Sequence, residues 1–150
     1  MLRRFEQFTA SISAINRFIQ KIERDEMEKY GLKGAFAQYL LAMQQHPEGI
    51  TATELCDVCD RNKAAVSRIL SELEQKGLIC RADERDSQYR ARLTLTSAGQ
   101  DAANYVCQKA ALAAELVGSG LSDEARTALY SALELLTKNI ESVSATGLPD

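Results

Sequence analysis

Apolar residues recur at helical spacing in the first segment of the chain. They stand at Phe5, Phe8, Ile12, Ile15, Ile19 and Ile22, so the steps alternate between three and four residues. This spacing is the heptad seam of a long helix, which Gly31 is suited to end. A second seam with the same steps, in a helix that Ser122 caps, comprises Leu129, Leu133, Leu136, Ile140 and Val143. Two such helices are hard to bury in a monomer, and we expect a homodimer joined through them.

Between the seams, the polar and apolar pattern predicts four shorter elements and a hairpin. Thr51 and Glu54 form a capping box for a short helix that ends near Val58 or Cys59. Asn62 is a good cap for the next helix, and Gly77 supplies its left-handed stop. We expect the remaining elements to be a helix at 34–46, strands at 78–81 and 90–95 around a polar tip, and a helix from Thr96 to Val117.

The expected order is therefore helix, tight turn, helix and hairpin, enclosed by long helices. We interpret it as a mainly α fold with a small β-hairpin wing: a winged helix-turn-helix plus terminal dimerisation helices. Residues 35–95 would form the DNA-binding region, and residues 1–34 and 96–150 the helical dimerisation region. A helix presented in this way fills a major groove, and a basic arm beside it reaches the neighbouring groove.

Charge supports this interpretation by its distribution. The chain of 150 residues has a formal net charge of −3, yet residues 61–92 carry eight Lys or Arg against five Asp or Glu. Residues 35–60 carry four acids and no Lys or Arg. The basic balance thus lies on the segment expected to meet DNA. No apolar run is long enough for a membrane span, and the apolar residues of the basic start are spaced, so we expect a cytoplasmic protein without a signal peptide.

These motifs, in this order, resemble the MarR family of bacterial transcription regulators (multiple antibiotic resistance regulators). The residues that carry the resemblance are Ile-Thr-Ala-Thr-Glu-Leu (50–55), Val66-Ser67-Arg68, Leu73-Glu-Gln-Lys-Gly77-Leu-Ile-Cys-Arg81, Asp83-Glu-Arg85-Asp86 and Leu95-Thr-Ser-Ala-Gly99. The resemblance implies a dimeric repressor that binds pseudo-palindromic double-stranded operator DNA and is released by a small-molecule effector.

The resemblance also implies which residues meet DNA. The recognition helix would begin at Asn62 and offer Arg68 to guanine, whose major-groove edge matches a guanidinium fork. Lys63 and Ser67 suit phosphate contacts. Arg85 would enter the minor groove from the wing, with Asp83 supporting it. The remaining candidate contacts are Ala64, Ala65 and Arg90.

Three positions depart from the family pattern. Ala64 and Ala65 stand where hydroxyl side chains are common, and Asp60 stands where glycine is common. Alanine can touch a thymine methyl but cannot hydrogen-bond a phosphate. The hairpin is also one residue longer than usual. The two alanines and the acidic total charge leave open a second interpretation, a winged-helix module that binds protein rather than DNA.

The four cysteines leave a third interpretation open, a thiol-based redox-sensing regulator of the same fold. Cys56 and Cys59 form a C-x-x-C, but at the end of a short helix rather than in the strand-to-helix turn of a thioredoxin-like site. A zinc site would require Cys80 and the single histidine, His46, to converge with them. The simpler expectation is that the cysteines are reduced and pack as small apolar side chains, with no metal; Cys107 is the fourth.

The family resemblance implies an effector pocket between the dimer helices and the winged unit. Tyr30, Phe36, Tyr39 and Met43 are its candidate lining, although each of them taken singly fits a core position better. No Ser/His/Asp set, no paired catalytic carboxylates with a pocket and no glycine-rich phosphate loop is present in the sequence. We therefore expect no enzyme activity and no cofactor.

Overall fold

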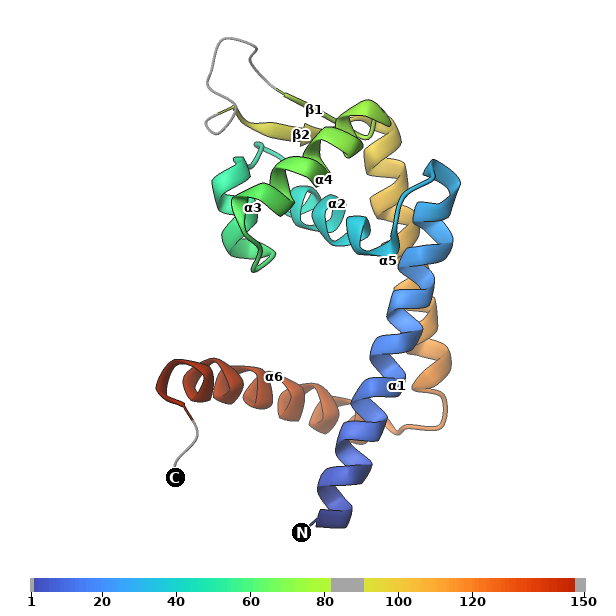
Figure 1. Ribbon diagram of the computed structural model, residues 1–150. Coiled ribbons are helices and arrows are strands. Elements are labelled where there is room, and N and C mark those ends of the chain that lie inside the picture. Colours follow the sequence, from blue (N-terminus) through green and yellow to red (C-terminus); the bar gives the residue numbers. More distant parts are fainter. Residues whose placement is uncertain (1, 82–90, 148–150) are drawn as a thin grey trace. The chain divides into compact units, whose positions relative to one another are not determined.

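The computed structural model describes residues 2–81 and 91–147 and divides the chain into two compact units, Met1–Ala111 and Leu112–Asp150 (Figure 1). The elements of the first unit are α1 (Leu2–Met27), two 3-10 turns (Glu28–Tyr30 and Gly34–Phe36), α2 (Ala37–Gln44), α3 (Ala52–Val58), α4 (Lys63–Gln75), β1 (Ile79–Arg81), β2 (Leu93–Leu95) and α5 (Ser97–Val117), which crosses into the second unit. The second unit is mainly α6 (Asp123–Thr146). The expected fold class, mainly helical with one small hairpin, is confirmed.

The helix-turn-helix forms where the local sequence predicts it. Thr51 accepts a hydrogen bond from the Glu54 N–H, and the Glu54 carboxylate accepts one from the Thr51 N–H at 2.7 Å, so the capping box is complete. Ile50 and Leu55 flank this cap and are both buried. Asn62 caps α4 through a 2.9 Å bond from the Ala65 N–H. The expected caps of α3 and α4 are confirmed.

The wing consists of two short antiparallel strands, with Ile79 opposite Leu95 and Arg81 opposite Leu93. The second strand begins at Leu93, later than the expected 90–95, and the expected tip lies in residues 82–90, outside the described part of the chain. Leu93 also forms two backbone hydrogen bonds with Ile50, at 2.9 and 3.0 Å. The wing is therefore joined by its backbone to the residue that precedes the cap of α3.

One apolar core connects these elements. Leu55 from α3, Leu73 from α4 and Leu93 from β2 are fully buried in it. From α2 and α5 come Leu40 and Ala103. Helix α4 and the wing consequently pack on a single shared core.

The start of α5 packs directly on the turn after α4. Thr96 donates from its hydroxyl to the Gly77 carbonyl at 2.6 Å and accepts from the Gly99 N–H at 3.1 Å. A Cβ placed on Gly99 would lie 1.9 Å from the Leu78 carbonyl oxygen. Gly99 therefore allows two backbone segments to approach more closely than any side chain would permit.

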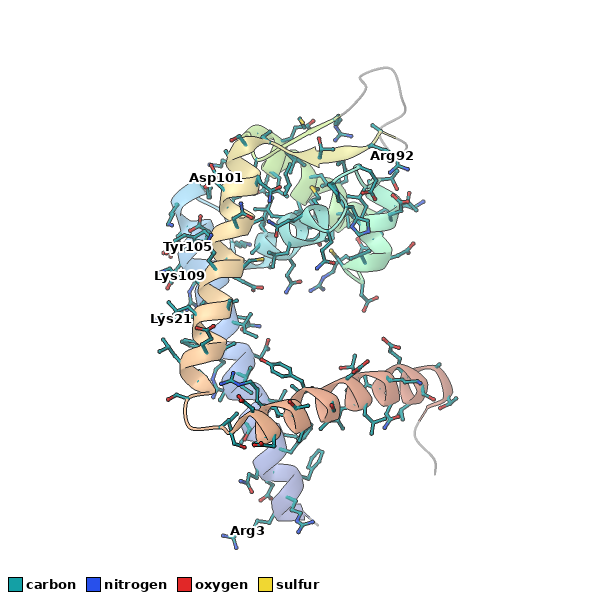
Figure 2. All side chains as sticks on the ribbon, turned by 180° about the vertical axis from the view of Figure 1, so that it is seen from behind. Arg3, Lys21, Arg92, Asp101, Tyr105 and Lys109 are labelled. Atoms are coloured by element: carbon teal, nitrogen blue, oxygen red, sulfur yellow. The ribbon has the colours of Figure 1, made fainter. Side chains whose placement is uncertain are left out.

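The 3-10 turn that follows α1 contacts α5 through a cation over an aromatic ring. The ammonium group of Lys29 lies 3.7 Å from the centre of the Tyr105 ring and pairs with the buried carboxylate of Glu26. Lys109 approaches the same ring, at 5.3 Å, and Figure 2 shows it beside Tyr105 on α5. A cation over a tyrosine face is attracted by the ring quadrupole.

Both heptad seams are exposed on the single chain. The α1 seam from Phe5 to Ile19 is 41–65% exposed, and only Ile22 packs partly against the core. The α6 seam from Leu129 to Val143 is 37–62% exposed. Monomers seldom expose apolar stripes of this length. Among the helices described, none has the length and apolar character to cross a membrane.

Candidate nucleic-acid interface

The first two turns of α4 present a polar face above an apolar one. Val66, Leu70 and Leu73 are buried and fix the inner face of the helix. Arg68 is exposed on the outer face, whereas Lys63 is exposed at the helix start and lines a small cavity with Val66 and Leu70. Of the other candidates in these turns, Asn62 and Ala64 are exposed, whereas Ala65 and Ser67 are half-buried. The fold thus brings together on one helix the residues that sequence analysis selected there.

Arg68 is available at this face. Its Nε donates a long hydrogen bond of 3.4 Å to the Ala64 carbonyl. The ion pairs that the structure shows for the described residues join Lys29 to Glu26 and Arg81 to Glu74, and neither involves Arg68. Glu72 stands four residues after Arg68, at the spacing of a helical ion pair, but no such pair is formed between them. The guanidinium remains exposed and able to pair with another planar acceptor.

The turn before α4 adopts a left-handed conformation at Asp60, where φ is 48°. Left-handed backbone disfavours most residues because Cβ approaches the following carbonyl, but aspartate tolerates it. The departure from glycine at this position is thus compatible with the usual turn. Arg61 follows, and its N–H donates to the Cys56 carbonyl at 2.9 Å, which closes the turn.

Substitutions at Asp60 should separate conformation from charge. We expect Asp60→Asn to leave the free energy of unfolding nearly unchanged, because asparagine also tolerates the left-handed region. Asp60→Val should lower it by about 1–2 kcal/mol, because a β-branched residue is strained there. Urea denaturation of the two variants checks this. Equal stability of both would show that the turn relaxes to another conformation.

Two arginines at the base of the wing were not among the predicted site residues. Arg81 of β1 donates from Nε and Nη2 to the two carboxylate oxygens of Glu74 on α4, at 3.0 and 3.3 Å. Arg92, labelled at the base of the wing in Figure 2, donates from Nη1 to the Gly49 carbonyl at 2.6 Å. Their pairing partners lie on other elements, so spacing along the sequence gave no indication of these contacts. Asp83, Arg85 and Arg90 fall outside the described residues.

The candidate effector residues lie in or against the core of the single chain. Phe36, Tyr39 and Met43 are 6%, 2% and 1% exposed. Tyr30 is partly buried against them. Burial raises the pKa of the Tyr39 hydroxyl above its usual value. The structure therefore places Phe36, Tyr39 and Met43 in the core, as each residue taken singly suggested. That these residues line an effector pocket stays a prediction.

All four cysteines are free thiols. Cys56 and Cys59 pack partly against the core, and burial raises the pKa of Cys59, which favours the unreactive thiol. The exposed Cys107 donates to the Gln44 side-chain carbonyl at 3.4 Å. Within the described ranges, no three His, Cys, Asp or Glu side chains are arranged to hold a metal ion. Whether any of the thiols responds to oxidants stays a prediction.

The cavity between α3, α4 and β1 is small. Its volume is about 10 Å³, which is room for about one water molecule. The residues that line it are Ala52, Cys56, Lys63, Val66, Ser67, Leu70 and Arg81. Helix α4 is therefore closely packed against α3 and β1 at this cavity.

A packed helix-turn-helix with an antiparallel hairpin at its end defines a winged helix-turn-helix protein. Residues 30–88 match the sequence model of the MarR family. Curated proteins gave no match to the chain. The MarR resemblance inferred from the motifs agrees with this family match over residues 30–88, and solved structures of MarR regulators share the fold over nearly the whole chain.

Three of these structures illustrate the agreement in fold. A MarR transcriptional regulator from Methanosarcina mazei Go1 is 24% identical, with a TM-score of 0.75 over 92% of this chain and 99% of that one. A putative MarR family regulator from Listeria monocytogenes, solved with a 26mer DNA, is 21% identical, with a TM-score of 0.73 over 95% and 96%. A MarR family regulator from Silicibacter pomeroyi is 24% identical, with a TM-score of 0.67 over 86% of both chains.

Proposed function

We propose that this protein is a homodimeric, non-enzymatic transcription regulator that represses by binding a pseudo-palindromic operator in double-stranded DNA. The observation that carries the proposal is the exposed part of α4, where Arg68 lies opposite a tightly packed inner face and Lys63 is exposed at the helix start. The surplus of basic residues over 61–92 supplies attraction to phosphates. The DNA in the Listeria monocytogenes structure supports the assignment, since that protein has the same fold.

In this proposal, α4 lies in the major groove. Arg68 hydrogen-bonds guanine, while Lys63 and Ser67 bind phosphates. Asn62 places the start of the helix near the DNA backbone. Ala64 and Ala65 offer methyl groups to thymine. The wing reaches the minor groove at the operator flanks through Arg85, with Asp83 bracing it and Arg90 near the backbone. Narrow A·T-rich grooves attract arginine, so such flanks would be preferred.

The dimer would form through the exposed seams of α1 and α6. Residues 1–34 and 96–150 then form the dimerisation region, and residues 35–95 the DNA-binding region. A two-fold dimer presents two α4 helices, whose half-sites lie about one turn of DNA apart. A small molecule bound near Tyr30, Phe36, Tyr39 and Met43 would release the operator by changing the relation of the two α4 helices. The protein would act in the cytoplasm.

Alanine substitutions on α4 test the reading role of this helix. Arg68→Ala should reduce discrimination between operator and mismatched DNA by about 1–3 kcal/mol, because a bidentate arginine–guanine pair is lost. Lys63→Ala should weaken binding to every sequence alike and reduce the slope of log K against log salt by about 0.9. Fluorescence anisotropy over a salt series on operator and scrambled duplexes measures both effects.

Lys76→Ala is the matched control, since Lys76 is an exposed lysine at the other end of the same helix. It should leave discrimination unchanged. If Arg68→Ala and Lys63→Ala both keep the affinity and discrimination of the wild type, α4 is not the reading element. If the wild type binds no duplex, the protein-binding module suggested by Ala64, Ala65 and the net charge of −3 becomes the better interpretation.

A further inference from the structure

We propose that Arg92 is a positioning residue of the DNA interface, which fastens the base of the wing to the loop before α3 and so sets how the wing stands beside the recognition helix. This inference rests on the proposed function, because it concerns how the wing meets the operator flanks. Arg92 would act through the wing and would not itself touch DNA.

The contact is short and closely fitted. The Arg92 Nη1 donates to the Gly49 carbonyl at 2.6 Å. The stem of Arg92 also lies against the Gly49 backbone, because a Cβ on Gly49 would be 2.9 Å from the Cβ of Arg92. Gly49 has a φ of +94°, which disfavours other residues in any case. The glycine therefore provides both the carbonyl and the space that Arg92 uses.

The backbone beside this contact joins the same two segments. Ile50 and Leu93 exchange two hydrogen bonds, at 3.0 Å from the Ile50 N–H and 2.9 Å from the Leu93 N–H. Ile50 and Leu93 are 1% and 0% exposed. The bridge is antiparallel, so Gly49 and Arg92 precede its two residues from opposite ends, and the Arg92 side chain reaches across the bridge to the Gly49 carbonyl.

Acidic residues surround the depression that Arg92 lines. This surface depression of about 340 Å³ contains three carboxylates. Its lining residues are His46, Glu48, Gly49, Ile50, Glu54, Asp57, Val58 and Arg92. The pKa of Glu54 lies below its usual value, mainly because Thr51 donates hydrogen bonds to its carboxylate. The positive charge of Arg92 lowers this pKa further. Nearby carboxylates attract the Arg92 guanidinium, and they repel a DNA phosphate that approaches the same place.

The other strand of the wing is fixed to a different helix. Arg81 on β1 forms the bidentate pair with Glu74 of α4, whereas Arg92 connects the start of β2 to the loop that enters α3. Each strand of the wing is thus attached by one arginine side chain, β1 to α4 and the start of β2 to the loop before α3. Loss of the Arg92 contact should therefore change the wing's direction without disturbing the packing of α4.

The test compares Arg92→Met, which removes the donor and the charge, with Arg92→Lys, which keeps both. Gly49→Ala is a second variant that displaces Arg92 without removing any basic residue. Binding to operators with A·T-rich and G·C-rich flanks is measured over a salt series, well below the melting temperature of each variant. Amide hydrogen exchange at Ile50 and Leu93 reports the bridge without DNA.

We expect Arg92→Met and Gly49→Ala to reduce the preference for A·T-rich flanks by about three- to tenfold, as loss of one hydrogen bond allows. Arg92→Lys should restore most of that preference. The salt slope should be unchanged, and exchange at both amides should be faster in Arg92→Met.

Three results would overturn the proposal. A salt slope reduced by about one in Arg92→Met would make Arg92 a phosphate contact. An unchanged flank preference, with faster amide exchange, would limit its role to stability. Unchanged exchange would show that the contact does not hold the wing. These results differ from a wild type that binds no duplex, which would refute the proposed function itself.

Discussion

Gly99→Ala is expected to lower the free energy of unfolding by at least about 3 kcal/mol, which is at or beyond the upper range for an inserted methyl group. The added Cβ would lie 1.9 Å from the Leu78 carbonyl oxygen, and 2.9 Å from its carbon. Neither atom belongs to a flexible side chain, so α5 would have to move away from the turn after α4. Urea denaturation monitored by circular dichroism measures the loss.

Gly77→Ala is the matched control at the same junction. Its φ is +69°, but a Cβ there meets nothing within 4 Å. It should cost only the strain of a left-handed alanine, about 1–2 kcal/mol. If Gly99→Ala is no more destabilising than Gly77→Ala, the approach of α5 to Leu78 is not as close as the structure shows.

Ile12→Glu on α1 is expected to convert the proposed dimer into a monomer at micromolar concentration. Ile12 is 41% exposed on the single chain and would lie in the middle of the α1 seam. An unpaired carboxylate buried between two chains costs several kcal/mol, whereas the same glutamate on an exposed helix costs little. Sedimentation velocity measures the mass, and operator binding should fall with it.

Ser13→Glu is the control, because Ser13 is also exposed on α1 but lies beside the seam. This variant should sediment as the wild type does. Leu136→Glu, in the α6 seam, should resemble Ile12→Glu if both seams are buried together. A wild type that sediments as a monomer, or an Ile12→Glu variant that remains dimeric, would contradict assembly through α1.

The sequence by itself determined the helices of the winged unit because their signals are local. Thr51 with Glu54 and Asn62 satisfy backbone groups within three residues of themselves, which neighbouring sequence alone decides. The candidate residues of α4 were predictable for the same reason, since helical periodicity places Arg68 opposite Val66 and Leu70, with Lys63 exposed at the start of the helix. The seams likewise follow from spacing alone.

Only the tertiary structure decided what depends on elements distant in sequence. The position of Gly99 near a helix start does not by itself require a glycine. Glycine is required there because the Leu78 carbonyl, from another segment, occupies the space of a side chain. Phe36, Tyr39 and Met43 suited either a pocket or a core by type, and packing assigned them to the core. Arg81 and Arg92 are basic strand residues, and no pattern names Glu74 and the Gly49 carbonyl as their partners. A hydrogen bond or a close approach between two separate segments leaves no repeating pattern in the sequence, because only folding fixes the distance between the two segments.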